Sequence, residues 1–310
     1  MRKVKTRIDV YQLVTDKIIE ALDEGVLPWN KSWSVSGGNN FPTRYNGEYY
    51  KGINVLLLGL TQYTNPNWMT WNQAAETCGL KKNEDGKWIN EDGKGVRAGE
   101  KGTTVVYYGN FKVEDTDAPK GGPKRYKTIP FPKTYTVFNA QQIDNLPDKF
   151  FPEPAKPMQT GVKNKAIDAY AKTLGVHGTL NHDGGDVAFY KPSSDTIHMP
   201  TFEQFHTSED YYCTLFHEYT HWTKTKARCN RDMKSYALEE LVAEMGAAFL
   251  MSRWGLASKP RPDHAQYIKS WLSALRGDKK AIFTASKKAQ EAVAFIMGDK
   301  EKEATQQKAA

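Results

Sequence analysis

Three residues have the types and spacing of a metal-binding catalytic motif: His217, Glu218 and His221, in the pattern His-Glu-x-x-His. Residues four apart share one face of an α-helix, so both imidazoles can reach the same ion. Glu218 lies beside them and can take a proton from a water molecule that the ion activates. Imidazole nitrogen suits zinc, which keeps one position open when it is catalytic. The motif therefore predicts one Zn²⁺ per chain, with Glu218 as the catalytic base.

A site of this kind needs a third protein ligand, and the best source is the acidic segment 239–244. Glu240 and Glu244 are four residues apart, so they share a face of the helix expected there. One can bind the ion while the other accepts a hydrogen bond from a ligand histidine. Small residues at 246–248 allow that helix to pack closely against the first. The residues alone leave the choice of ligand open, and a solvated acidic face is the alternative.

Cysteine and the remaining histidines are weaker candidates for the metal. Cys213 shares the face of the two motif histidines, but it lies about 12 Å from His221 along the helix axis, too far for one ion. Cys229 follows a basic loop and stays open as an alternative ligand. An odd set of three cysteines predicts free thiols in a reducing compartment. We expect surface or structural roles for the histidines outside the motif: His177, His182, His198, His206 and His264.

The elements that must position the motif are helices. Apolar and aromatic residues surround it and predict a buried helix over 208–223, followed by a second over 237–254. Further helices are expected over 162–174, 265–275 and 279–297, and short strands over 187–190 and 196–199.

A cluster of prolines between 147 and 157 forbids a continuous helix and stiffens the chain. We therefore expect a linker over 147–158 between an N-terminal domain, 1–146, and a C-terminal domain, 159–298. A polar tail, 299–310, follows. In the first domain we expect helices over 8–22 (ended by Gly25), 54–63 and 71–78, strands over 103–108 and 134–138, and a mobile loop over 115–132.

Aromatic and basic residues are interleaved between 26 and 108. Single-stranded nucleic acid binds where bases stack on aromatic rings while cations follow the phosphates. The core of a small α+β domain shows the same composition, so many of these rings should be buried. The loop over 120–133 is either a second basic contact or a solvated loop. The residues favoured for DNA contact are Trp33, Arg44, Tyr45, Tyr50, Lys51, Arg97 and Lys101.

Composition sets the class of protein. With 39% hydrophobic and 25% charged residues the chain has a globular profile. No stretch approaches the roughly 20 apolar residues that span a bilayer, and no apolar core follows the basic N-terminus, so we expect neither membrane association nor a signal peptide. We therefore expect the protein to stay in the cytoplasm where it is made, unless a dedicated transfer machine moves it. The net charge of +7 is spread evenly over both halves and permits an anionic partner.

The two acidic motifs together resemble the gluzincin pattern, in which the first acid of the second motif is a metal ligand. That resemblance assigns the third ligand to Glu240 and leaves Glu244 to support a histidine. The thermolysin-like branch has an aspartate where this chain has Glu244, which puts the partner of that side chain in question. Tyr236, next to the acidic motif, could steady a developing oxyanion.

Nearly the whole chain also resembles the ArdC-type antirestriction family of plasmids and other mobile elements. The matching segments are 15–19, 28–29, 50–58, 97–103, 214–222, 236–244 and 267–272. The resemblance implies an α+β protein of two domains. The first is a small α+β domain that binds single-stranded DNA and is also found on some plasmid primases. The second is zincin-like and mostly helical, with a short sheet.

The function that this resemblance implies is protection of incoming mobile DNA from host restriction. Two alternatives stay open. In the first, the protein is a DNA-tethered zinc metallopeptidase that cleaves a host protein. In the second, it is a DNA-binding protein whose metal only holds the fold.

Overall fold

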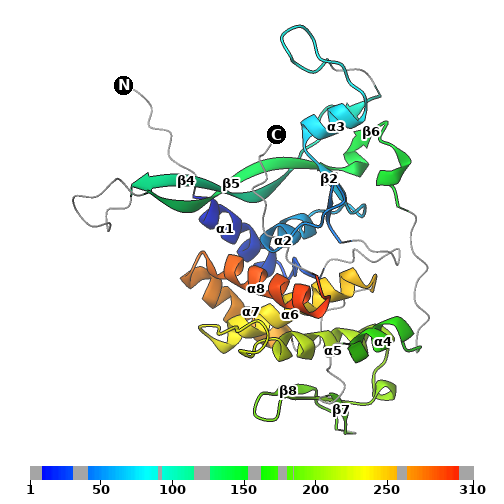
Figure 1. Cartoon of the computed structure of the whole chain (residues 1–310), viewed down its shortest axis with the longest axis vertical. Coiled ribbons are helices and arrows are strands. Elements are labelled where there is room, and N and C mark those ends of the chain that lie inside the picture. Colours follow the sequence, from blue (N-terminus) through cyan, green and yellow to red (C-terminus); the bar gives the residue numbers. More distant parts are fainter. Residues whose placement is uncertain are drawn as a thin grey trace.

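The computed structural model describes residues 9–30, 41–89, 93–114, 126–152, 162–173, 180–183, 185–256 and 264–299. It has an α+β fold in which a twisted sheet and three helices lie above a mostly helical C-terminal half (Figure 1). The first half contains α1 (Val10–Asp23), β1 (Thr43–Arg44), α2 (Ile53–Gly59), β2 (Asn67–Met69), α3 (Trp71–Thr77), β3 (Gly95–Val96), β4 (Thr103–Glu114), β5 (Tyr126–Asn139) and β6 (Ile143–Asp144). Short 3-10 helices at Ala140–Gln142 and Asp148–Phe150 lead out of it.

The second half contains α4 (Lys165–Thr173), β7 (Leu180–His182), β8 (Phe189–Lys191), β9 (Thr196–Met199), a 3-10 helix at Phe202–Gln204, α5 (Ser208–Trp222), α6 (Tyr236–Arg253), α7 (His264–Gly277) and α8 (Ala281–Ile296). The expected helices around the motif are confirmed to within two residues. Their starts have a local cause, because Thr207 and Ser235 cap the first turns of α5 and α6 through their hydroxyls. The structure adds β7, which is parallel to β9 and was not predicted.

The N-terminal sheet has the strand order β1-β2-β5-β4. Strands β4 and β5 pair antiparallel over twelve positions, from Thr103 opposite Val137 to Glu114 opposite Tyr126. The base of this ribbon lies on α1 and α2, and its outer end projects well beyond the helices (Figure 1). Asn54 at the start of α2 joins this helix to β4, since its side-chain amide both donates to and accepts from the backbone of Val106.

The predicted loop over 115–132 was wrong for residues 126–132, which form the outer half of β5. Pro130 and Pro132 made a strand unexpected, because proline cannot donate a ladder hydrogen bond. Among the described residues, β5 pairs over this stretch with β4 alone, and a strand edge without a ladder partner tolerates proline. Residues 115–125 of the predicted loop lie outside the described part of the chain.

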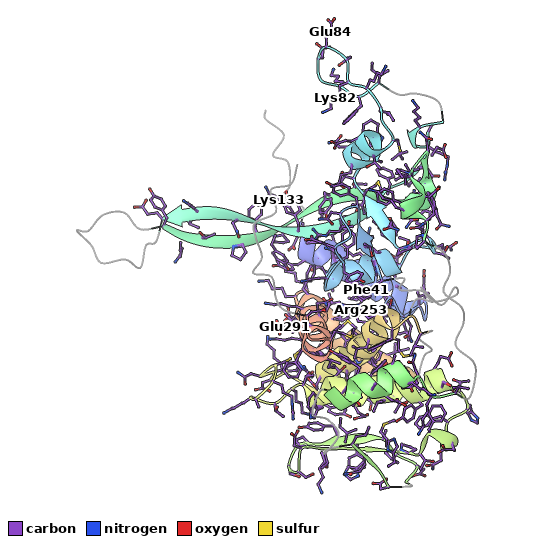
Figure 2. The ribbon with its side chains drawn as sticks, turned by 45° about the vertical axis from the view of Figure 1, so that its right-hand side comes forward. Phe41, Lys82, Glu84, Lys133, Arg253 and Glu291 are labelled. Carbon is purple, nitrogen blue, oxygen red and sulfur yellow. The ribbon has the colours of Figure 1, made fainter. Side chains whose placement is uncertain are left out.

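One apolar cluster joins the two halves of the chain. The ring of Trp29 meets that of Trp271 edge to face, with centroids 5.6 Å apart, and Phe41 meets Phe249 in the same way at 5.8 Å. Tyr49 bridges the two halves here, because its ring meets that of Phe41 at 5.5 Å and the guanidinium of Arg253 lies 4.6 Å from its centre (Phe41 and Arg253 are labelled in Figure 2). The helical half is therefore packed against the N-terminal half through a continuous core, and the domain limits given above stay a prediction.

Helices α5 and α6 cross in close contact at Gly246. A methyl group at this position would overlap the side chain of Thr220, since its carbon would lie 2.6 Å from Thr220 Cγ2 and closer still to the hydroxyl oxygen. Glycine is thus required for the two helices to approach so closely, and this approach brings the His-Glu-x-x-His face towards the acidic residues of α6.

We predict that Gly246→Ala destabilises the fold by about 1–3 kcal/mol, because the added methyl group overpacks the crossing. Thr220→Ala should recover much of this loss in the double variant, since it removes the overlapping atoms. Gly277→Ala, at the end of α7 with open space around it, is the matched control and should be neutral. Urea unfolding measures all four proteins, and equal stability of the Gly246 and Gly277 variants would contradict the prediction.

Candidate metal centre

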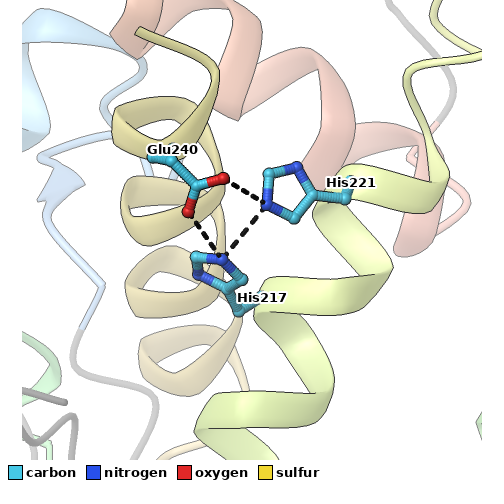
Figure 3. Close-up of side chains that lie close together, drawn as sticks. All are labelled: His217, His221 and Glu240. Atoms are coloured by element: carbon cyan, nitrogen blue, oxygen red, sulfur yellow. Dashed lines mark hydrogen bonds and ion pairs between the residues drawn. The ribbon is translucent and has the colours of Figure 1, made fainter. Parts of the chain in front are cut away.

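The structure brings His217, His221 and Glu240 together from α5 and α6 (Figure 3). The two Nε2 atoms are 3.1 Å apart. The carboxylate of Glu240 lies 3.4 Å from His217 Nε2 and 3.3 Å from His221 Nε2. All three residues are buried, at 3%, 8% and 5% exposure. Within the described ranges they are the one group of three side chains arranged to hold a metal ion.

The other nitrogen of each imidazole faces a second carboxylate. His217 Nδ1 is 3.0 Å from Glu244 Oε1, and His221 Nδ1 is 3.1 Å from Glu239 Oε1. An ionised carboxylate only accepts hydrogen bonds, so the tautomer that suits both contacts has its proton on Nδ1. Both Nε2 atoms then present lone pairs to one another and to Glu240. Such an arrangement is repulsive unless a cation or an additional proton lies between these atoms.

Zinc fits this donor set. Tetrahedral bonds of about 2.0–2.1 Å place neighbouring donor atoms about 3.3 Å apart, close to the three separations given above. Burial acts to raise the pKa of Glu240, but the two histidines that face its carboxylate outweigh this effect and hold the pKa well below its ordinary value. The third donor is therefore an anion, as a divalent cation requires.

Glu239 and Arg231 are part of the site, although the sequence did not identify them. The guanidinium of Arg231 donates to Glu239 through Nε at 2.9 Å and Nη2 at 2.8 Å, and also to the carbonyl of Thr220 at 2.7 Å. Burial acts to raise the pKa of Glu239, but His221 and Arg231 lower it to about 2. A carboxylate held in this way stays ionised and fixes the orientation of the His221 ring.

Glu218 is 4% exposed, and its carboxylate makes no hydrogen bond or ion pair with any residue that the structure describes. Tyr236 is different: its side chain is 69% exposed, and its hydroxyl is 3.5 Å from that of Tyr267. Partial burial of that hydroxyl, together with hydrogen bonds to Tyr267 and Glu240, raises the pKa of Tyr236. It therefore stays protonated and can donate a hydrogen bond at the edge of the site.

The alternative ligands lie apart from this group. Neither Cys213 nor Cys229 forms a disulfide, and Cys229 contacts the carbonyl of Glu291. His182 contacts the hydroxyl of Tyr211 at 2.9 Å, and His198 contacts Asp183 at 2.7 Å. Both histidines have structural partners, as expected, while His177 lies outside the described residues.

Of the predicted DNA contacts, Tyr50 is corrected by the structure. Its ring is 2% exposed and belongs to the core, so neither face is open to a base. Arg97 is exposed, but two carboxylates engage it, Glu100 at 2.7 Å and Asp144 at 3.2 Å. An arginine neutralised in this way attracts phosphate weakly. The sequence could not distinguish these cases, because neither burial nor a partner distant in the chain appears in a local pattern.

The other predicted contacts that the structure describes are accessible to solvent. Tyr45, Lys51 and Lys101 are exposed. Arg44 is half-buried, with its guanidinium 5.1 Å from the centre of the Tyr50 ring. Trp33 lies outside the described residues.

Fold and site together define a zincin-like metallopeptidase domain that follows a small α+β domain. Residues 165–288 match the model of a zincin-like metallopeptidase, and residues 8–138 match that of the N-terminal domain of the anti-restriction factor ArdC. The chain belongs to the ArdC antirestriction family. None of the described helices is long and apolar enough to cross a membrane.

Two solved structures of the antirestriction protein ArdC from plasmid R388 are similar over nearly their whole length. The metal-free form is 38% identical, with a TM-score of 0.76 over 94% of this chain and 97% of that one. The Mn(II)-bound form is 37% identical, with a TM-score of 0.72 over 94% and 98%.

The relatives by sequence include two kinds of protein. A DNA primase TraC of Escherichia coli is 33% identical over 96% of this chain, which spans only 28% of that primase. The uncharacterized protein y4eC of Sinorhizobium fredii (strain NBRC 101917 / NGR234) is 32% identical over 94% of this chain and 92% of its own length. The same unit thus occurs alone and as part of a longer protein.

We predict that Arg231→Ala costs about 3–5 kcal/mol of stability, because it leaves the buried charge of Glu239 without its cation. Arg276→Ala is the control, since it removes an exposed ion pair with Asp23 and should change stability little. Thermal or urea unfolding compares the two variants. Similar losses would mean that the buried pair does not support the site.

Proposed function

We propose that this protein is an antirestriction protein of a mobile element. It binds single-stranded DNA in the bacterial cytoplasm and protects incoming DNA from host restriction. The observation that supports this most strongly is the similarity to R388 ArdC along almost the entire length of both chains. The shared unit in primases, which act on DNA, supports the assignment of DNA as the partner.

The proposed cofactor is one divalent ion per chain, zinc, held by His217, His221 and Glu240. Support comes from the three converging donor atoms and from the Mn(II)-bound state of the R388 relative. When bound, the ion acts as a Lewis acid and makes water a nucleophile near neutral pH. Glu244 and Glu239 hold the two imidazoles with Nε2 turned inward.

A second function, cleavage of a host protein, is favoured by one observation. Glu218 is a buried carboxylate with no partner among the described residues, and such a group is costly to keep for structure alone. As a general base it would take a proton from water and pass it to the leaving amine. The protonated hydroxyl of Tyr236 would donate a hydrogen bond to the developing oxyanion.

We predict one zinc ion per chain in protein purified without chelators, measured by elemental analysis. His217→Ala should lose the ion and also stability, because metal binding contributes to folding. His206→Ala, which alters an exposed histidine outside the group, should keep both. A metal-free wild-type protein, or equal metal content in both variants, would contradict the assignment.

Protection itself is predicted to depend on DNA binding more than on hydrolysis. In a transfer assay into restricting cells, Glu218→Gln should retain most protection, since it keeps the metal ligands and changes only the base. Lys51→Ala combined with Lys101→Ala should reduce protection, because both exposed cations are lost. The opposite pattern, with loss only in the Glu218 variant, would establish peptide hydrolysis as the protective activity.

A further inference from the structure

The ribbon of β4 and β5 carries different chemistry on its two faces. Side chains alternate along a strand, and the register pairs odd with odd and even with even positions, as in Tyr107 opposite Lys133. The odd face therefore combines positions 103–113 of β4 with 127–139 of β5, and none of these positions is acidic. The even face includes Glu114 at its outer end.

Aromatic rings form a continuous row along the inner part of the odd face. The guanidinium of Arg44 lies over the Tyr50 ring, and the Tyr50 hydroxyl is hydrogen-bonded to Tyr135. Tyr135 in turn meets Tyr107 edge to face at 5.6 Å. Tyr50 is buried and supports the row from below, whereas Tyr107 and Tyr135 are half-exposed.

Farther out, the ammonium of Lys133 lies between two rings. It is 6.0 Å from the centre of Tyr107 and 4.8 Å from that of Phe131 (Lys133 is labelled on the ribbon in Figure 2). Phe131 lies against Gly109 on the paired strand, where a methyl group would be 3.2 Å from the ring. The row continues to Ile129, which is 37% exposed, and to the exposed Lys127.

We propose that this odd face of the ribbon is the track on which single-stranded DNA lies. The proposal rests on the single-strand binding proposed above and adds where the strand binds. Half-exposed rings offer faces or edges for unpaired bases, and the lysines between them can follow the phosphates. In a duplex the bases are stacked on one another, so these rings would find no partner. The absence of carboxylates from the odd positions removes repulsion along the path.

The test is binding of a fluorescent oligothymidylate of about 30 nucleotides to the full-length protein, by anisotropy at several salt concentrations. Phe131→Ala with Lys133→Ala alters the odd face. Tyr126→Ala with Lys112→Ala, at exposed positions of the even face, is the matched control, since each pair removes one ring and one lysine. We expect the odd-face pair to lose about tenfold or more in affinity, as the loss of base stacking implies. The even-face pair should stay within about threefold.

Charge reversal gives a second comparison that a folding defect cannot imitate, because both lysines are exposed. Lys133→Glu should weaken binding and lower the salt dependence of the affinity, whereas Lys112→Glu should do neither. Equal behaviour of the two faces would overturn the track while leaving single-strand binding intact. A wild-type protein that binds no single strand would instead refute the proposed function, and a preference for duplex would overturn the track.

Discussion

The close crossing of α5 and α6 is the constraint on which the metal site depends. It gathers the buried carboxylates of Glu218, Glu239, Glu240 and Glu244 in the core, with Arg231 as their buried cation. With both imidazoles neutral, this group has an excess of negative charge, and buried charge without compensation is costly. A dication would offset most of that excess. The two helices therefore pack stably in this way mainly when a metal ion is bound between them.

Much of this half of the molecule could be predicted from local pattern. The helices follow from their apolar periodicity and from capping residues such as Thr207 and Ser235, and the four-residue spacing of the histidines directs both rings to one side. The contact of Arg231 with Glu239 could not be predicted, because Arg231 is in a loop whose path is fixed only by tertiary packing. The third-ligand choice needed a resemblance, since Glu240 and Glu244 are equivalent by spacing alone.

The N-terminal half was harder to predict for physical reasons. An aromatic residue beside a cation looks the same in sequence whether it is buried, as Tyr50 is, or exposed, as Tyr45 is. The outer half of β5 was not predicted as a strand because it contains Pro130 and Pro132. Proline is tolerated in a strand that has a neighbour on one side only, and this depends on the whole sheet rather than on the local sequence. The shared core was also hidden, since no local pattern links Trp29 with Trp271.

That shared core has a consequence for how the chain folds during synthesis. Helix α1 packs against α7, and Asp9 pairs with Lys279, 270 residues later, at 2.6 Å. At a translation rate of about 5–20 residues per second, roughly 15–55 s separate the emergence of these two partners from the ribosome. Throughout that interval α7 is not yet available to bury the apolar side of α1. Helix α1 is thus made long before the helix that completes its packing, and the nascent chain depends on protection from aggregation until α7 emerges.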